Sequence, residues 1–324
     1  MVTSFDILIV AGFGREGLLL NCLASIKLIP NEIVLKNIFI LFNGRSANEE
    51  IRLRFPSLPI KTLETHVLQS PGSTRNKLIQ ASTSEFLLFL DDDVILKEDY
   101  FLKVSNFLSY DLIGGVDGLY DEKDEKQVIL ARLMSSPLIT GPTYLRHYYS
   151  ENLIEGPNET ILTLCNLWVR RSLIISKGIL FNENLLRCEE NPWLIELKES
   201  GARSIYLGSL QVGHYRRVKF WELLRTQLKS GYYRGQTLKK NFSRMHYFFL
   251  LPLITPLIFL ATVILYPWLA FAAIILHALV MTVLMKGWKN WMFFYSRVLC
   301  FHLGFSFGLL WGILVFSGTK TTQD

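Results

Sequence analysis

The chain has 324 residues, of which 50% are hydrophobic, and a formal net charge of +6 at pH 7. This length accommodates one sizeable soluble domain and a second part, and a mean hydropathy of +0.27 is too high for an ordinary soluble protein. The four cysteines have no metal-ligand or disulfide-framework spacing, which excludes a disulfide-rich scaffold and favours a reducing compartment.

Over the first 215 residues, short apolar runs alternate with helical patterns. The runs Ile7–Ala11, Asn37–Phe42 and Glu85–Leu90 predict strands, and aliphatic residues repeat at helical spacing between the first two. Strands that alternate with helices indicate an α/β domain with a mostly parallel sheet, covered on both faces.

Three polar segments follow these strands, namely Gly12–Glu16, Asn43–Ser46 and Asp91–Asp93. Ligands of such sheets bind beyond the carboxyl ends of the strands, so we expect the site there. The first segment also fits a Gly-rich dinucleotide fingerprint, but that fingerprint requires an acidic residue after the second strand, where this chain has Asn43. A dinucleotide enzyme is therefore disfavoured.

The acidic triplet Asp91-Asp92-Asp93 is the sharpest of these features. Adjacent carboxylates repel one another, and hard cations such as Mg²⁺ or Mn²⁺ take oxygen ligands and commonly bridge to phosphates. In extended backbone, Asp91 and Asp93 turn to the same side. By itself the triplet is equally consistent with a solvated loop or a helix cap.

The order and spacing of several motifs resemble family 2 glycosyltransferases. Pro71–Lys77, then the strand into Asp91–Asp93, is similar to the central signature of that family. Phe181–Leu185, Glu189-Glu190 and Gly201 resemble its later acidic block, and His214 stands where many members have a histidine. The resemblance covers about residues 5–215 and implies a GT-A type, Rossmann-like fold.

The resemblance also implies residue roles. It implies inversion at the anomeric carbon, with Glu190 as the general base and Glu189 as a supporting residue. A divalent metal, Mn²⁺ or Mg²⁺, is expected at Asp91 and Asp93, assisted by His214. The residues expected to bind the nucleotide-sugar donor are Gly12, Arg15, Glu16, Asn43, Arg75, Asn76, Asp91 and Asp92. For Arg75, pairing with a nearby acid is an open alternative.

Three departures from the family pattern stand out. Asn43 replaces an acidic residue similar to a uracil-contacting position, Gly12–Glu16 differs from the usual opening turn, and Glu189-Glu190 replaces Glu-Asp. A processive QxxRW motif is absent from the sequence, so nothing supports a polymer synthase. A helix N-terminal carboxylate pair remains the alternative for Glu189 and Glu190.

The last third of the chain has two long uncharged stretches. Residues 247–285 and 298–316 contain no Asp, Glu, Lys or Arg, and one charge at a bilayer centre costs about 2.5–3.5 kcal/mol. About 20 such residues span the hydrocarbon core, so we expect two or three spans within 247–318, near 247–265, 268–285 and 298–316. The alternative is a buried bundle of a soluble protein.

A basic segment, residues 216–246, joins the two parts. It holds nine Lys or Arg and one acid, a net +8, so the rest of the chain sums to −2. Residues 218–230 have the pattern of a basic amphipathic helix, at home at a membrane surface or packed on a domain. Its position beside apolar stretches favours membrane lipids over nucleic acid. A cytoplasmic domain and Asp324 on the far side are expected.

Together these features predict a multi-pass glycosyltransferase of the cell membrane with a cytoplasmic catalytic domain at 1–215. It would transfer a sugar from a nucleotide-sugar donor to a hydroxyl of a lipid-linked or cell-surface glycan. Two alternatives remain open: a catalytically inactive membrane adaptor, and a metal-dependent nucleotidyltransferase, whose usual Gly-rich, Lys-containing loop is absent from the sequence.

Overall fold

The chain divides into two compact units in a computed structural model, which describes residues 2–48, 50–240, 250–286 and 289–315. The first unit consists of Met1–Glu122 and Thr143–Tyr215, and the second of Lys123–Pro142 and Arg216–Asp324. The second unit thus takes in a short segment that no sequence pattern set apart.

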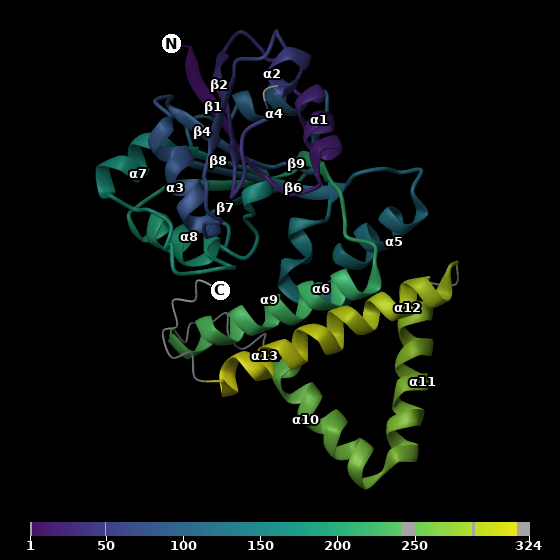
Figure 1. The fold of residues 1–324 in the computed structure, drawn as a ribbon. Coiled ribbons are helices and arrows are strands. Elements are labelled where there is room, and N and C mark those ends of the chain that lie inside the picture. The colour runs from purple at the N-terminus through teal and green to yellow at the C-terminus, as the bar shows by residue number, and fades with distance from the viewer. Residues whose placement is uncertain (1, 49, 241–249, 287–288, 316–324) are drawn as a thin grey trace. The chain divides into compact units, whose positions relative to one another are not determined.

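A nine-stranded sheet forms the centre of the first unit (Figure 1). Its strands are β1 (Thr3–Ala11), β2 (Ile33–Phe42), β3 (Ile60–Glu64), β4 (Phe86–Asp91), β5 (Val94–Leu96), β6 (Leu112–Leu119), β7 (Leu153–Glu155), β8 (Leu167–Arg170) and β9 (Ser204–His214). The spatial order is β3-β2-β1-β4-β8-β6-β9-β5, with β7 paired to β9.

The first four strands of that order are parallel. In β1, Ile7 pairs with Ile38 on one side and Leu88 on the other, so all three predicted strands are neighbours. Beyond β4 the sheet is mixed, because β8 runs antiparallel to both β4 and β6. The predicted α/β class with a GT-A type, Rossmann-like sheet is confirmed.

Helices cover this sheet: α1 (Glu16–Ala24), α2 (Glu50–Arg54), α3 (Pro71–Ala81), α4 (Tyr100–Ser105), α7 (Arg171–Lys177), α8 (Glu190–Glu199), and the short 3₁₀ helices η1 (Gly141–Arg146), which begins in the second unit, and η2 (Leu164–Asn166). Local sequence fixes their ends. The Ser70 hydroxyl accepts the Ser73 N–H at 3.2 Å and Pro71 opens α3, whereas α7 stops at Gly178, whose φ is +65°.

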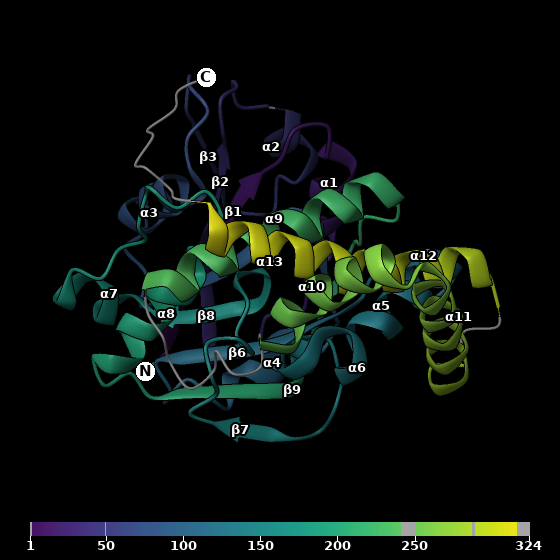
Figure 2. The same ribbon diagram turned by 90° about the horizontal axis from the view of Figure 1, so that it is seen from below.

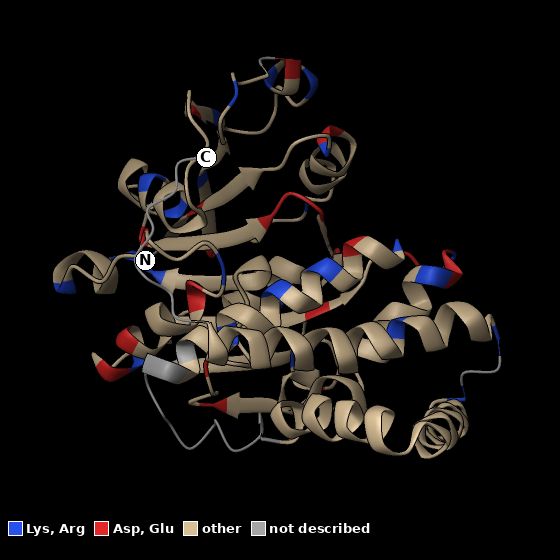
Figure 3. Cartoon of the chain, turned by 60° about the horizontal axis from the view of Figure 1, so that its bottom comes forward, with Lys and Arg blue, Asp and Glu red and all other residues tan. Residues whose placement is uncertain are grey.

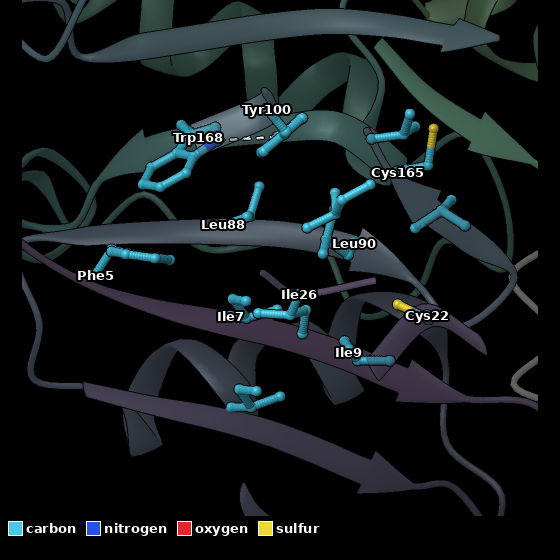
Figure 4. Packing of buried hydrophobic residues seen from close by; sticks show 14 of the residues in the cluster. Phe5, Ile7, Ile9, Cys22, Ile26, Leu88, Leu90, Tyr100, Cys165 and Trp168 are labelled. Carbon is cyan, nitrogen blue, oxygen red and sulfur yellow. Dashed lines mark hydrogen bonds between the residues drawn. The ribbon is translucent and has the colours of Figure 1, made fainter. Parts of the chain in front are cut away.

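The core lies on both faces of the sheet, because successive side chains of a strand point to opposite sides. Ile7 and Ile9 pack with Leu88 and Leu90 on one face (Figure 4), whereas Leu8, Leu87 and Phe89 belong to the cluster on the other. Trp168 contacts the Phe5 ring at 4.7 Å and donates its indole N–H to the Tyr100 hydroxyl at 3.0 Å, which satisfies its one polar atom.

The second unit is helical. It comprises α5 (Glu125–Met134), α6 (Pro137–Thr140), α9 (Phe220–Lys240), α10 (Leu250–Leu265), α11 (Pro267–Leu284), and a continuous helix made of α12 (Trp291–Leu299), the π-helical η4 (Cys300–Gly304) and α13 (Phe305–Leu314). Two helices, Pro267–Leu284 and Trp291–Leu314, are long and apolar enough to cross a membrane, and the apolar helix Leu251–Leu265 is shorter.

Charge separates the helices of this unit. Helix α9 carries Arg225 and Lys229 of the predicted amphipathic segment 218–230 and extends ten residues beyond it, whereas α10 and α11 contain no charged residue (Figure 3). Residues 241–249, where the first predicted span begins, lie outside the described residues.

Candidate active site

The acidic triplet lies where β4 ends, as predicted. Asp91 is the last residue of β4, and β5 begins at Val94. Because Val94 pairs with His214 at the end of β9, the residue before it, Asp93, lies beside that histidine. A second contact holds them together, since the Tyr215 N–H donates to the Asp93 carbonyl at 2.9 Å. Strand pairing therefore joins two parts of the site 121 residues apart in the sequence.

Asp91, Asp93 and His214 form a candidate metal centre. One ligand atom from each lies within 4.8 Å of the others. Asp93 Oδ1 is buried and accepts no hydrogen bond from the described residues, although His214 Nε2 lies 3.1 Å away. The two carboxylates supply the oxygen ligands that Mn²⁺ and Mg²⁺ prefer, and Mn²⁺ accepts an added imidazole more readily than the harder Mg²⁺ does, so these residues fit a divalent cation.

His214 is oriented by an acid that the sequence analysis missed. Its Nδ1 lies 2.9 Å from Asp117 Oδ1 near the end of β6. Burial opposes charging of the imidazole, but the charge and hydrogen bond of Asp117 and the nearby Cys165 outweigh it and raise the pKa of His214 to about 10. With Nδ1–H donated to Asp117, Nε2 faces Asp93. A proton on Nε2, or a cation in its place, would offset the repulsion between the Nε2 lone pair and the Asp93 carboxylate.

Asp117 also contacts His147, whose Nδ1 lies 3.4 Å from its other carboxylate oxygen. Each of the two side chains is 8% exposed. Neither His147 nor Asp117 was among the site residues predicted from the sequence. The sequence did contain an indication of Asp117. This acid lies in the apolar run Leu112–Leu119, close to the end of the strand, where an acidic side chain reaches the edge of the sheet at which ligands bind.

Arg15 is held against the acidic triplet. Its guanidinium pairs with Asp92 at 2.9 Å and with Asp93, and the Gly12 N–H donates to Asp92 at 2.6 Å. Burial raises the pKa of Asp92, and the charge of Arg15 opposes that rise. Two of the predicted donor-binding residues, Gly12 and Arg15, therefore contact the acids directly.

Glu16 and Asn43 have partners of their own near the ends of β1 and β2. Glu16 pairs with Arg45, which also donates to the Gly12 carbonyl at 2.7 Å. The Asn43 amide donates to the Gln69 carbonyl and accepts from the Gln69 N–H, both at 2.9 Å. Asn43 thus secures the loop before α3, and its contact with a nucleotide base stays a prediction.

Two motif blocks that are far apart in the sequence meet beside the sheet. Asn76 of α3 donates to the Phe181 carbonyl at 3.0 Å and accepts the Phe181 N–H at 2.9 Å. Gly72 is required there, because a methyl group at this position would lie 2.7 Å from the Asn182 carbonyl oxygen. Asn76 is buried and links these segments, so its role toward a donor remains a prediction.

Glu189 and Glu190 differ in their surroundings. Glu189 is buried and forms an ion pair with Arg75, whereas Glu190 is partly exposed as the first residue of α8. Burial raises the pKa of Glu189, a rise that Arg75 opposes and Glu190 supports. The alternative role given to Arg75, pairing with an acid, is observed.

Helix α8 is positioned over the second half of β4. Trp193 of α8 meets the Phe89 ring at 5.7 Å and stacks on Phe181 at 4.1 Å. Phe89 precedes Asp91 by two residues and Trp193 follows Glu190 by three, so one aromatic cluster ties the acidic block to the strand that carries the triplet.

The chain matches the model of one protein family and resembles solved structures. The model of glycosyl transferase family 2 matches residues 7–176, just over half of the chain, and no curated protein matches. Among solved structures, TarS 1-349 of S. aureus is 14% identical, with a TM-score of 0.48 over 69% of this chain and 64% of that one. The complex of TarS 1-349 with UDP-GlcNAc is also 14% identical, with a TM-score of 0.48 over 72% of this chain and 65% of that one. This chain thus spans less than two thirds of those relatives.

Proposed function

Since the chain belongs to glycosyl transferase family 2, we propose that it is a membrane-anchored, inverting glycosyltransferase. It takes a sugar from a nucleotide-sugar donor and transfers it to a hydroxyl of a lipid-linked or cell-surface glycan. The observation that carries this proposal is the cluster of Asp91, Asp93 and His214, whose ligand atoms lie within 4.8 Å of one another at the end of β4.

In this proposal Asp91, Asp93 and His214 hold a divalent cation, Mn²⁺ or Mg²⁺. When bound, that cation supplies positive charge that offsets the negative charge of the departing nucleoside diphosphate. Asp117 keeps the imidazole of His214 in one orientation, as outer partners of metal-ligating histidines do.

The remaining residues bind substrates and move the proton. Glu190 takes the proton of the acceptor hydroxyl as that oxygen attacks the anomeric carbon from the side opposite the leaving diphosphate. Glu189, neutralised by Arg75, supports the start of α8. Gly12, Arg15 and Glu16 line the edge of the sheet at which the donor binds, with Asn43, Arg75 and Asn76 supporting the adjoining loops.

Membrane anchoring is supported by the apolar helices of the second unit, of which two are long and apolar enough to cross a membrane. The charge of the basic segment before them favours a cytoplasmic catalytic domain. A membrane location in turn favours an acceptor that is itself attached to the membrane.

The test is a donor screen followed by an activity assay. Nucleotide sugars are screened by the rise in melting temperature that each produces, with and without Mn²⁺. Donor hydrolysis and transfer are then measured with the best one. Mn²⁺-dependent release of nucleoside diphosphate supports the proposal. Binding without turnover indicates the inactive adaptor, and release of pyrophosphate indicates a nucleotidyltransferase.

A further inference from the structure

Helix α9 and the last helix, α12–α13, lie side by side in the second unit (Figures 1 and 2). They run parallel, because Leu228 meets Gly308 and Tyr232 meets Gly312, one helical turn further along both. A methyl group added at Gly308 or Gly312 would overlap the carbonyl oxygen of its partner. The two backbones are therefore in direct contact.

The contact is reciprocal and polar as well as close. Gly231 lies against the Phe305 carbonyl and Gly235 against that of Leu309, so small residues spaced four apart face each other on both helices. This is the pattern that lets helix backbones approach closely in apolar surroundings. Gln236 then donates to the Gly312 carbonyl at 2.6 Å, which adds a hydrogen bond that any slippage of the helices would break.

Helix α9 is too charged for the hydrocarbon core. Arg225 and Lys229 are exposed on it, and the sequence adds Glu222 and Arg234 within the same helix. Each such charge is costly at the centre of a bilayer. Because α13 contacts α9 from Leu228 to Gln236, about two helical turns, the two helices share the same depth, and α13 cannot cross the membrane while α9 stays at its surface.

The hairpin of α10 and α11 is different. In Figure 1 its two helices form a V that extends away from the α9–α13 pair, and their 16 and 18 residues are about 24 and 27 Å long. In the most apolar stretch of Trp291–Leu314, 44% is buried inside the structure, compared with 22% for α11. Tyr266 and Trp268 at the turn are 54% and 67% exposed, as aromatic residues at a lipid interface would be.

We infer that Trp291–Leu314 does not span the membrane but lies flat with α9 at the lipid surface, and that only the α10–α11 hairpin enters the hydrocarbon. This inference rests on the membrane anchoring in the proposed function. The lipid partner fits the pair, because α9 presents Trp221, Arg225 and Lys229 as exposed residues one turn apart, an aromatic side chain followed by two basic ones. The inferred topology has two membrane spans in place of the three expected from the sequence. It places the C-terminus on the same side of the membrane as residue 1.

The test fuses reporters to the full chain expressed in a bacterium. Green fluorescent protein, which fluoresces only inside the cell, and alkaline phosphatase, which is active only outside, are each placed after Asp324, with fusions before Met1 as the reference. We expect fluorescence and no phosphatase activity at both ends. Phosphatase activity at Asp324 alone overturns the inference and restores three spans. If the chain is not in the membrane fraction, the proposed anchoring fails instead.

A pair of variants tests the helix contact itself. Gly312→Leu places a side chain against Tyr232, so the melting temperature of the chain in detergent should fall by several degrees. Leu314→Phe, at a side chain that is 67% exposed, should leave it unchanged. If Gly312→Leu also melts as the unaltered chain does, α13 is not held on α9 and the inference is overturned.

Discussion

Asp117 lies 2.9 Å from Nδ1 of His214, whose other ring nitrogen lies 3.1 Å from Asp93. The three side chains come from β6, from the end of β9 and from the turn before β5. Asp117 thus contacts the candidate metal centre through His214 and is not one of the three proposed ligands.

The substitution Asp117→Asn should weaken Mn²⁺ binding about 10–100-fold, the usual cost of losing an outer partner of a metal-ligating histidine. Titration calorimetry on the full chain measures this directly. Asp99→Asn serves as the control, because Asp99 is exposed and asparagine is an equally good helix N-cap. Unchanged affinity in Asp117→Asn would remove Asp117 from the site.

Asp93→Asn should abolish both Mn²⁺ binding and transfer. It replaces a buried oxygen that accepts no hydrogen bond from the described residues, and Arg15, which pairs with Asp93, keeps Asp92 as a charged partner, so we expect the fold to stay intact. Circular dichroism should therefore match the unaltered chain. Activity that persists in EDTA, or near-normal turnover of Asp93→Asn, would mean that the triplet is a solvated loop.

Glu190→Gln keeps the shape of the side chain and removes its basicity, so turnover should fall about 10²–10⁴-fold with nearly unchanged donor affinity. Glu189→Gln should cost less turnover, because Glu189 is paired with Arg75 and is not the base, and it should not lower stability at neutral pH, because burial disfavours the charged form of Glu189. Comparing turnover and melting temperature of both variants separates these roles. Similar small losses of stability in both, with normal turnover, would identify a helix-end carboxylate pair instead.

Glu189 should also make stability depend on pH. Its folded pKa is raised above the ordinary value of 4.5 by burial, so its contribution to stability is fully present below about pH 4.5 and is lost as the pH rises through the folded pKa. The melting temperature of the unaltered chain, relative to that of Glu189→Gln, should therefore fall as the pH rises above about 4.5. A difference that grows with pH would show that the Arg75 pair outweighs burial.

Much of the first unit is predictable from local patterns. The apolar runs ending at Ala11, Phe42 and Leu90 are strands within a few residues, because each is buried on both faces and bounded by polar or glycine residues. Those strand ends then located the acidic triplet and the turn that contacts it. For these three strands, the same local sequence pattern identifies the strand and the place at which it ends.

The pairings across the sheet are not visible in the sequence. Asp117 meets His214 only because β6 and β9 are parallel neighbours whose register shifts between Gly115 and Val116, and nothing local to Asp117 or His214 encodes that register. The same holds for Arg75 and Glu189, which are 114 residues apart. The antiparallel strand β8 was also missed, since its four residues are too few to show a period.

The discontinuity of the second unit bears on how a soluble catalytic fragment should be cut. Leu130, Leu133 and Ile139 belong to Lys123–Pro142, yet they are buried against Leu223, Phe294 and Val298 of the C-terminal helices. Truncation after Tyr215 alone would strip that apolar patch of its cover and favour aggregation. Replacing residues 123–142 with a short polar loop in the same truncation removes the patch along with its partners.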